Sequence, residues 1–224
     1  MREKIIFICL LITLIISPSV SFGAFGVKLD YLIPAEENAY GQGFWDYYME
    51  DLGGYSSGFG SPKNGLFMTN FYGNTRWPSG FGLDYGGKTP IIIYLNAKKY
   101  IDYGYDTSWE ETTFTKIVWH FFYISARYNI PLSVSPYFGG GLSGYYVNAE
   151  YTSTESTSHD NQQVVPGIHG FAGIQFFHKR KVHLDLELRY EVTSDSDSTI
   201  ENAIAPYNDG GNLGGLSFLI GASW

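Results

Sequence analysis

The sequence has little cysteine and, beyond its N-terminus, no long hydrophobic segment. Its single cysteine, Cys9, lies inside an apolar run at residues 5–16 rather than at the end of that run, where a lipid-modified cysteine stands, so a lipoprotein is excluded. A chain cleaved after this region has no cysteine and cannot form disulfides. A membrane-spanning helix needs roughly 20 consecutive apolar residues, and no later segment supplies them.

Basic residues are also few. The chain has 14 Lys and Arg against 22 Asp and Glu, which gives a formal net charge of -8 at pH 7, and its only basic cluster is the short run at residues 179–181. Binding to a phosphate backbone requires a concentrated Lys/Arg surface. Nucleic acid is therefore excluded as an expected partner.

The N-terminus has the pattern of a cleaved secretory signal peptide over residues 1–23. Arg2 and Lys4 precede the apolar run, and small residues follow it up to Gly23. The run is about a dozen residues, which is too short for a spanning anchor. We expect export and cleavage after Gly23, leaving one domain over residues 24–224.

Aromatic residues and glycine are abundant, at 18% and 27 residues, and they occur in segments of alternating polarity. The clearest segment is residues 182–192. Its apolar positions are Val182, Leu184, Leu186, Leu188, Tyr190 and Val192, and between them lie His183, Asp185, Glu187, Arg189 and Glu191. A period of two places these sets on opposite faces of a strand, which suits lipid outside a barrel and a polar lumen inside it.

The last segment, residues 216–224, has the same period. Its apolar face consists of Leu216, Phe218, Ile220, Ala222 and Trp224. Residues 24–33, 131–146 and 164–177 alternate similarly, and the first of them places Lys28 and Asp30 opposite an apolar face. We expect residues 216–224 to pair with residues 24–33 and so to close a cylinder.

Three further strands complete the prediction. Residues 79–86 and 91–101 are expected to form a hairpin around residues 87–90, and residues 112–128 form a long strand. That strand has apolar residues on both faces, so its register stays open. Either the set Ile117, Trp119, Phe121 and Tyr123 faces outward, or the set Val118, Phe122 and Ile124 does.

The resulting fold class is all-β, an eight-stranded antiparallel transmembrane β-barrel with short periplasmic turns and long external loops. Short connections fall at 87–90, 129–131 and 178–181, and long ones at 34–78, 102–111, 151–163 and 193–212. Within the first loop, residues 44–51 are compatible with a short helix and residues 64–72 have some strand character. A membrane strand at 64–72 would need a further strand to keep the number even.

Three segments carry a resemblance to a known group of proteins: residues 136–141 (PYFGGG), 186–191 (LELRYE) and 213–224 (LGGLSFLIGASW). With them the chain resembles the small eight-stranded OmpA/OmpW-type outer-membrane barrel superfamily, as a barrel without a periplasmic domain. The resemblance implies a Gram-negative outer membrane, with its lipids and lipopolysaccharide as surroundings. It also implies that the last strand is an assembly signal for the barrel-assembly machinery, with Trp224 where such proteins usually have Phe.

Charged residues on the inward faces are expected to form a structural ion-pair network. The expected members are Lys28, Asp30, Asp84, Lys98, His183, Asp185, Glu187 and Arg189. An eight-stranded barrel has room only for side chains, and unpaired buried charges cost several kcal/mol. A network that rearranges to gate a narrow pore is the alternative.

No catalytic, cofactor-binding or metal-ligating residues are expected. His159 and Asp160 follow Ser156 and Ser158 in an expected loop, but neighbours in sequence do not establish a catalytic geometry. Lipid A deacylases have a His and a Ser two residues apart on an outward-running strand, and residues 190–194 contain no His. The acidic loops suggest carboxylates bridged by divalent cations to lipopolysaccharide phosphates.

The sequence thus favours a non-enzymatic surface role, in envelope integrity or in loop-mediated contact with an unspecified external partner. The alternatives are a narrow channel for small or hydrophobic solutes of the OmpW kind and a lipid A-modifying hydrolase.

Overall fold

A computed structural model describes residues 23–36, 40, 55–58, 65–102, 107–153, 159–177, 182–196, 199–200, 207–208 and 211–224. Except for Gly23, the expected signal peptide lies outside the described residues, as does the short helix considered at residues 44–51. Within the described ranges, no helix is long and apolar enough to cross a membrane.

Almost all of the described chain is β-strand. The strands are β1 (Phe25–Pro34), β2 (Tyr55–Gly58), β3 (Leu66–Arg76), β4 (Phe81–Lys88), β5 (Ile91–Asp102), β6 (Thr107–Asn129), β7 (Ser135–Ser153), β8 (His159–Phe176), β9 (His183–Thr193), β10 (Asp195–Ser196), β11 (Thr199–Ile200), β12 (Tyr207–Asn208), β13 (Gly211–Asn212) and β14 (Gly215–Ser223). The short strands β10 and β13 pair with each other, and so do β11 and β12. All the others belong to one sheet.

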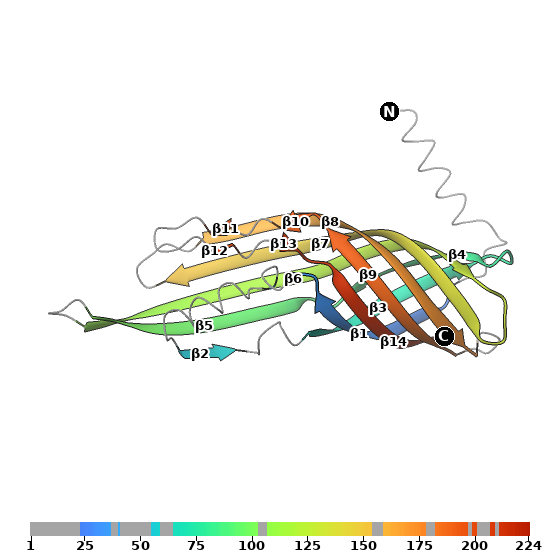
Figure 1. Cartoon of the computed structure of the whole chain (residues 1–224), viewed down its shortest axis with the longest axis horizontal. Coiled ribbons are helices and arrows are strands. Elements are labelled where there is room, and N and C mark those ends of the chain that lie inside the picture. Colours follow the sequence, from blue (N-terminus) through green and yellow to red (C-terminus); the bar gives the residue numbers. More distant parts are fainter. Residues whose placement is uncertain are drawn as a thin grey trace, which may run out of the picture.

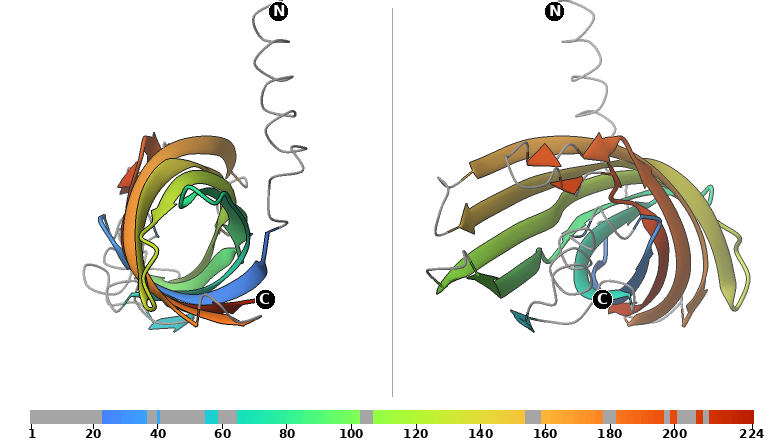
Figure 2. Two further views of the ribbon diagram at one scale, coloured as in Figure 1. Left: turned by 90° about the vertical axis from the view of Figure 1, so that its right-hand side faces the viewer. Right: turned by 60° about the vertical axis from the view of Figure 1, so that its left-hand side comes forward.

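Eight strands of that sheet close into a barrel. β1, β3, β4, β6, β7, β8, β9 and β14 pair antiparallel in this order, and β14 returns to β1. Figure 2 shows the closed ring end-on. Phe25 and Trp224 exchange two backbone hydrogen bonds of 2.9 and 3.1 Å at the seam. The expected eight-stranded antiparallel barrel and its closure by the last strand are confirmed.

We call the end of the barrel that holds Phe25 and Trp224 the terminal end, and the opposite end the loop end. Residues 77–80, 130–134 and 177–182 connect strands at the terminal end. In the first of these turns the Gly80 amide donates to the Trp77 carbonyl, and Gly80 has a φ of 90°. A glycine suits this position because side chains with a Cβ rarely adopt such a φ.

The prediction of a hairpin around residues 87–90 is wrong. β4 pairs with β6 up to Gly86↔Tyr123, and β5 continues along the same strand from Ile91↔Val118. β4 and β5 therefore run in one direction and together take the place of a single barrel strand. Pro90 has no N–H to donate to a ladder, so it interrupts the pairing without reversing the chain.

Because β4 and β5 count as one barrel strand, the barrel needs one strand that the sequence does not predict, and this strand is β3. It lies inside the segment 34–78 that the sequence assigns to one long loop, and it pairs with β1 on one side and β4 on the other. The strand character noted at residues 64–72 therefore belongs to a barrel strand. The number stays even because residues 79–101 contribute one strand instead of two.

A bulge in β6 resolves its two alternative registers. His120 pairs with Tyr145 of β7 and Phe122 with Gly144, so Phe121 is the extra residue. An extra residue exchanges the inward and outward faces of a strand. Trp119 faces outward on the loop-end side of the bulge, and Phe122 and Ile124 face outward on the other side. Each alternative is thus correct for one part of the strand.

At the loop end, strands continue beyond the closed ring. β5 pairs with β6 up to Asp102↔Thr107, β7 with β8 up to Tyr151↔His159, and β2 pairs with β5. We call β2 and residues 95–102, 107–114, 149–153 and 159–163 the loop-end extension, which projects away from the termini in Figure 1. The connections expected at 102–111 and 151–163 are therefore largely strand, and the one expected at 193–212 contains β10 to β13.

Candidate functional site: the lumen and the outer wall

The barrel buries its charges and exposes its apolar side chains. Along β9 the inward Asp185 is 0% exposed and Arg189 1%, whereas the outward Leu186 is 44% exposed and Tyr190 54%. The same alternation runs through the other barrel strands. Exposed outward residues include Phe25, Leu29, Phe67, Phe71, Phe81, Tyr85, Phe122, Ile124, Phe138, Leu142, Ile168, Ile174, Leu188, Phe218 and Ile220. Of the expected terminal assembly strand, Phe218, Ile220 and Trp224 are exposed, and Leu216 and Ala222 are half-exposed.

Arg127 of β6 is one centre of the lumen. Its guanidinium lies 3.2 Å from a carboxylate oxygen of Asp84 and 3.6 Å from one of Asp185, and its Nε donates to Asn129 at 2.8 Å. It also lies 3.5 Å from the centre of the Tyr137 ring. Because these groups come from β4, β6, β7 and β9, Arg127 joins opposite walls of the barrel.

Glu187 of β9 is a second centre. One of its carboxylate oxygens lies 2.5 Å from Lys28 Nζ and accepts a hydrogen bond from the Tyr137 hydroxyl at 3.1 Å. The other accepts two hydrogen bonds from the Arg189 guanidinium, at 2.7 and 3.0 Å. Arg189 in turn lies 4.6 Å from the Tyr123 ring centre. This carboxylate therefore has partners from β1, β7 and its own strand.

A third ion pair and a set of neutral donors complete the network. Lys88 Nζ lies 2.6 Å from Asp30, with both side chains almost fully buried. Asp185 accepts hydrogen bonds from the Tyr72 hydroxyl at 2.8 Å and from the Gln175 amide at 3.0 Å. Pairing of this kind offsets the desolvation cost of burying charge.

Toward the loop end the interior becomes mainly apolar, although the buried Lys116 lies between members of this apolar region. The buried apolar cluster there consists of Leu32, Tyr40, Met68, Ile93, Phe114, Val118, Tyr145, Val147, Ala149, Val165 and Leu213. Tyr40 comes from the connection between β1 and β3, and its hydroxyl donates to the Leu213 carbonyl at 2.6 Å. Burial, with Glu191 and Asp30 nearby, raises the pKa of Tyr40 far above its usual value. Its phenol therefore stays neutral and packs within the apolar layer.

The structure brings six of the expected network residues together in the lumen: Lys28, Asp30, Asp84, Asp185, Glu187 and Arg189. His183 is half-buried at the terminal end, 3.5 Å from the Ser223 hydroxyl. Lys98 lies in the loop-end extension, opposite Glu111 in the register, and its side chain is outside the described ones.

The sequence reading missed several inward charges. Lys88 falls in the turn that the sequence predicts at residues 87–90, and Arg127 falls in the strand whose register the sequence leaves open. Glu191 was recognised on the polar face of β9 but not included in the network. Its carboxylate accepts a short hydrogen bond from Ser143 and lies 3.8 Å from His120. The sequence does contain a pattern that predicts an inward Arg127. Arg127 is two residues from the polar Asn129, so the two side chains lie on the same face of the strand.

Two serine–histidine arrangements also lie inside the lumen. Ser125 Oγ is 2.7 Å from His169 Nε2, but His169 Nδ1 has no hydrogen-bond partner among the described residues, so no carboxylate orients the ring. His120 Nε2 lies 3.8 Å from Glu191, which accepts a hydrogen bond from Ser143, but neither ring nitrogen of His120 has a hydrogen-bond partner among the described residues. All these groups are at most 6% exposed, so solvent hardly reaches them.

Within the described part of the chain, no three His, Cys, Asp or Glu side chains are placed to hold a metal ion. The side chains of His159 and Asp160, and the two nearby serines at 156 and 158, are outside the described ones. Divalent cations are also expected to bridge the acidic loops to lipopolysaccharide, and most of the acidic side chains of those loops are likewise outside the described ones.

Comparison with known proteins gives matches of structure only. No family model matches the sequence, and no curated protein matches it. Neisserial surface protein A (NspA) matches with a TM-score of 0.43 and 15% identity, over 91% of this chain and 97% of the other. Ail, the attachment invasion locus protein of Yersinia pestis, in complex with a heparin analogue, matches with 0.43 and 12%, over 91% and 98%. The N-terminal barrel of Pseudomonas aeruginosa OprF matches with 0.32 and 12%, over 90% and 97%.

Proposed function

We propose that this protein is an integral outer-membrane β-barrel with a closed lumen, which acts non-enzymatically at the cell surface through its loop-end extension. The observation that carries the proposal is the inverted burial, with charges inside and apolar side chains outside around the ring. Soluble monomers rarely expose contiguous apolar patches of more than a few hundred Å². A membrane removes this surface from water.

The dimensions of the barrel strands support a membrane setting. A tilted strand of about 9–11 residues crosses the hydrocarbon core of a bilayer, and β1, β3, β9 and β14 have 10, 11, 11 and 9 residues. At the terminal end, Phe81, Tyr128 and Phe138 form an aromatic row with ring centroids 4.9 and 5.7 Å apart. Aromatic rows of this kind are typical of membrane–water interfaces.

The filled lumen favours a surface role over conduction. Buried ion pairs cross it from several walls, and the apolar cluster with Tyr40 lies above them. An eight-stranded barrel leaves little room beyond its own side chains, and this filling opposes a continuous path for water or a solute. The buried Ser125–His169 pair gives no comparable support to a hydrolase, because its serine is only 1% exposed.

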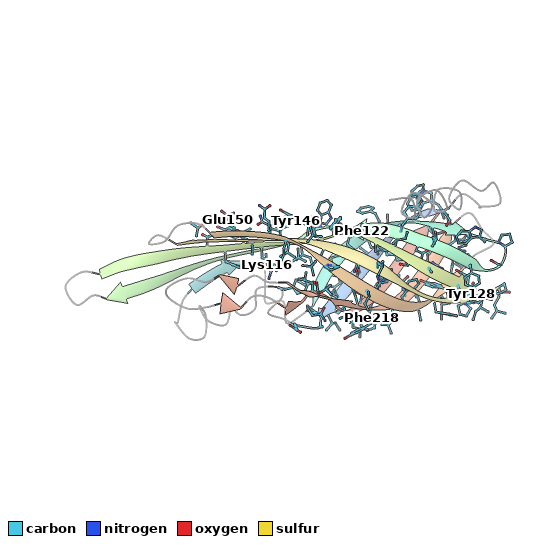
Figure 3. All side chains as sticks on the ribbon, turned by 90° about the horizontal axis from the view of Figure 1, so that it is seen from above. Lys116, Phe122, Tyr128, Tyr146, Glu150 and Phe218 are labelled. Carbon is cyan, nitrogen blue, oxygen red and sulfur yellow. The ribbon has the colours of Figure 1, made fainter. Side chains whose placement is uncertain are left out.

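The loop-end extension is the part available to an external partner. It continues from the barrel on the side opposite the termini, and Glu150 lies on it in Figure 3, whereas Tyr128 lies at the terminal end. In the proposed orientation this side meets lipopolysaccharide and the medium. The terminal end then faces the periplasm, where a signal-peptide-exported chain meets the barrel-assembly machinery.

Single-cysteine labelling in intact cells tests this orientation, since cleavage after Gly23 removes the only cysteine. Three exposed positions are informative: Thr152→Cys on the extension, Leu132→Cys in the terminal-end turn and Leu186→Cys midway along β9. A membrane-impermeant maleimide is expected to label only Thr152→Cys. Leu132→Cys should react once the outer membrane is opened, and Leu186→Cys only after the barrel is unfolded in detergent.

The cysteine-free mature chain is the control for unspecific labelling. Labelling of Leu132→Cys but not Thr152→Cys in intact cells would mean that the barrel has the opposite orientation to the proposed one. Labelling of Leu186→Cys in the folded protein would place β9 in water and contradict membrane insertion.

A further inference from the structure

The outer wall contains an apolar groove at mid-height. It has a volume of about 790 Å³ and crosses β3, β1, β14, β9 and β8. The outward side chains that line it are Leu29, Tyr31, Phe67, Ala172, Ile174, Leu186, Leu188, Phe218 and Ile220. Figure 3 places Phe218 on the outer surface of the barrel. Binding sites for small molecules typically have volumes of about 300–1,000 Å³, so this groove has the size of a site for one molecule.

The strand register explains the shape of the groove. One wall is a row of directly paired residues, Phe67, Tyr31, Phe218, Leu188 and Ala172. The other wall is the row Leu29, Ile220, Leu186 and Ile174. Between them runs the row Asp30, Leu219, Glu187 and Gly173, which gives the groove only its backbone because the first three side chains point into the lumen.

Strand geometry then gives the dimensions. The walls are two residues apart along each strand, which is about 7 Å, and four strand-to-strand steps make the longer wall about 19 Å long. The groove is therefore a narrow slot. In the next row toward the terminal end, the smaller Val27 and Ala222 lie between Phe71 and Leu184, so that row is lower at its middle than at its sides.

The shape and chemistry select one kind of occupant. A standard protein interface uses roughly 20–30 residues on each side, many more than the nine outward side chains here, so a second protein is disfavoured. No basic side chain lines the groove, so nothing in it selects the phosphates of a particular headgroup. A flexible polymethylene chain matches the length, the width and the apolar lining.

We infer that this groove binds one acyl chain of a bilayer phospholipid, and holds it longer than the rest of the outer wall holds its lipids. The inference rests on the proposed membrane location, because the groove then opens only toward hydrocarbon. Tyr31 and Phe67, with ring centroids 4.8 Å apart, form the aromatic end of the slot. At the opposite end, the small side chain of Ala172 makes the wall lower, and the acyl chain can leave the groove there.

Two pairs of variants test the groove against matched positions elsewhere on the outer wall. Phe218→Ala removes part of one wall, and Phe138→Ala removes a similarly exposed phenylalanine on β7. Ala172→Trp fills the low end, and Ala126→Trp adds the same bulk to an outward alanine on β6. None of these four side chains belongs to the lumen network.

The wild type and the variants are inserted into dimyristoylphosphatidylcholine vesicles, extracted into mild detergent and weighed by native mass spectrometry. We expect one retained phospholipid on the wild type, Phe138→Ala and Ala126→Trp. Phe218→Ala and Ala172→Trp should retain it roughly tenfold less, which corresponds to about 1.4 kcal/mol, at least about half of what fully burying a Phe side chain contributes.

Equal retention by all five proteins, or no lipid on an inserted wild type, would overturn the inference while leaving the membrane location standing. A lipid-free dimer of the wild type would assign the groove to a second copy instead. Failure of the wild type to enter vesicles at all would contradict the proposed function and the groove together.

Discussion

Arg127 shows how the lumen is stabilised at the scale of single residues. Its guanidinium is shared by Asp84 and Asp185 and lies against the face of Tyr137. Burying an ion costs several kcal/mol even after relaxation, and only well-placed partners offset this cost. Removing one partner leaves the others buried and uncompensated, so each member of the network matters more than an exposed ion pair does.

We therefore predict that Arg127→Met lowers the free energy of unfolding by about 3–5 kcal/mol. Arg127→Lys should lose less, because it keeps the charge and loses the Nε–H hydrogen bond to Asn129 and the planar contact with the Tyr137 ring. Urea unfolding from lipid vesicles, followed by tryptophan fluorescence, measures both. A change of less than about 0.5 kcal/mol in Arg127→Met, the range usual for surface sites, would show that the pairs contribute little.

Single residues also show how far the sequence alone could lead. The sequence correctly places five charged side chains inward because their strands alternate without interruption: Lys28, Asp30, Asp185, Glu187 and Arg189. The alternation fails at Phe121, where one extra residue exchanges the faces, and the apolar residues around it conceal the exchange.

At the scale of the element, β4 and β5 show why the strand number was predicted correctly but the strands were not. Pro90, which follows the pair Gly86–Gly87 within four residues, is a strong turn signal, yet the residues after it continue along β6 in the same register. What keeps the chain straight is pairing with a distant strand, together with the Thr89 amide, which donates to the Thr69 carbonyl at 2.8 Å. Such long-range pairing leaves no trace in a local pattern.

The bulge in β6 gives a prediction at this scale. Deleting Phe121 removes the extra residue, so either Lys116 and His120 turn outward or Ser125 and Arg127 do. A lysine or arginine that faces lipid costs about 2–4 kcal/mol at the middle of a bilayer and less toward its interfaces, and the buried partners of these side chains are lost as well. We expect this variant not to fold into vesicles.

The control is deletion of Ser156, which falls between β7 and β8 and changes the register of neither strand pair. The folded fraction is measured by resistance to protease and by the shift in electrophoretic mobility on heating. Normal folding of the Phe121 deletion would mean that the register of β6 does not decide which side chains face the lipid.

At the scale of the whole molecule, the barrel separates three environments. Its outer wall is apolar, its lumen toward the terminal end is filled by paired charges, and its interior toward the loop end is an apolar cluster that Tyr40 completes. The two interior layers are successive barriers to water and ions, and the extension stands beyond them. In the proposed function the barrel is therefore the membrane anchor, and the loop end is the surface that meets a partner.

Conductance through a planar lipid bilayer tests this central claim most directly. The refolded wild type is expected to insert, as judged by protease protection in matched vesicles, and to leave the current at the lipid baseline. Steady, reproducible conductance steps from the inserted wild type would contradict a closed lumen and assign the barrel to transport.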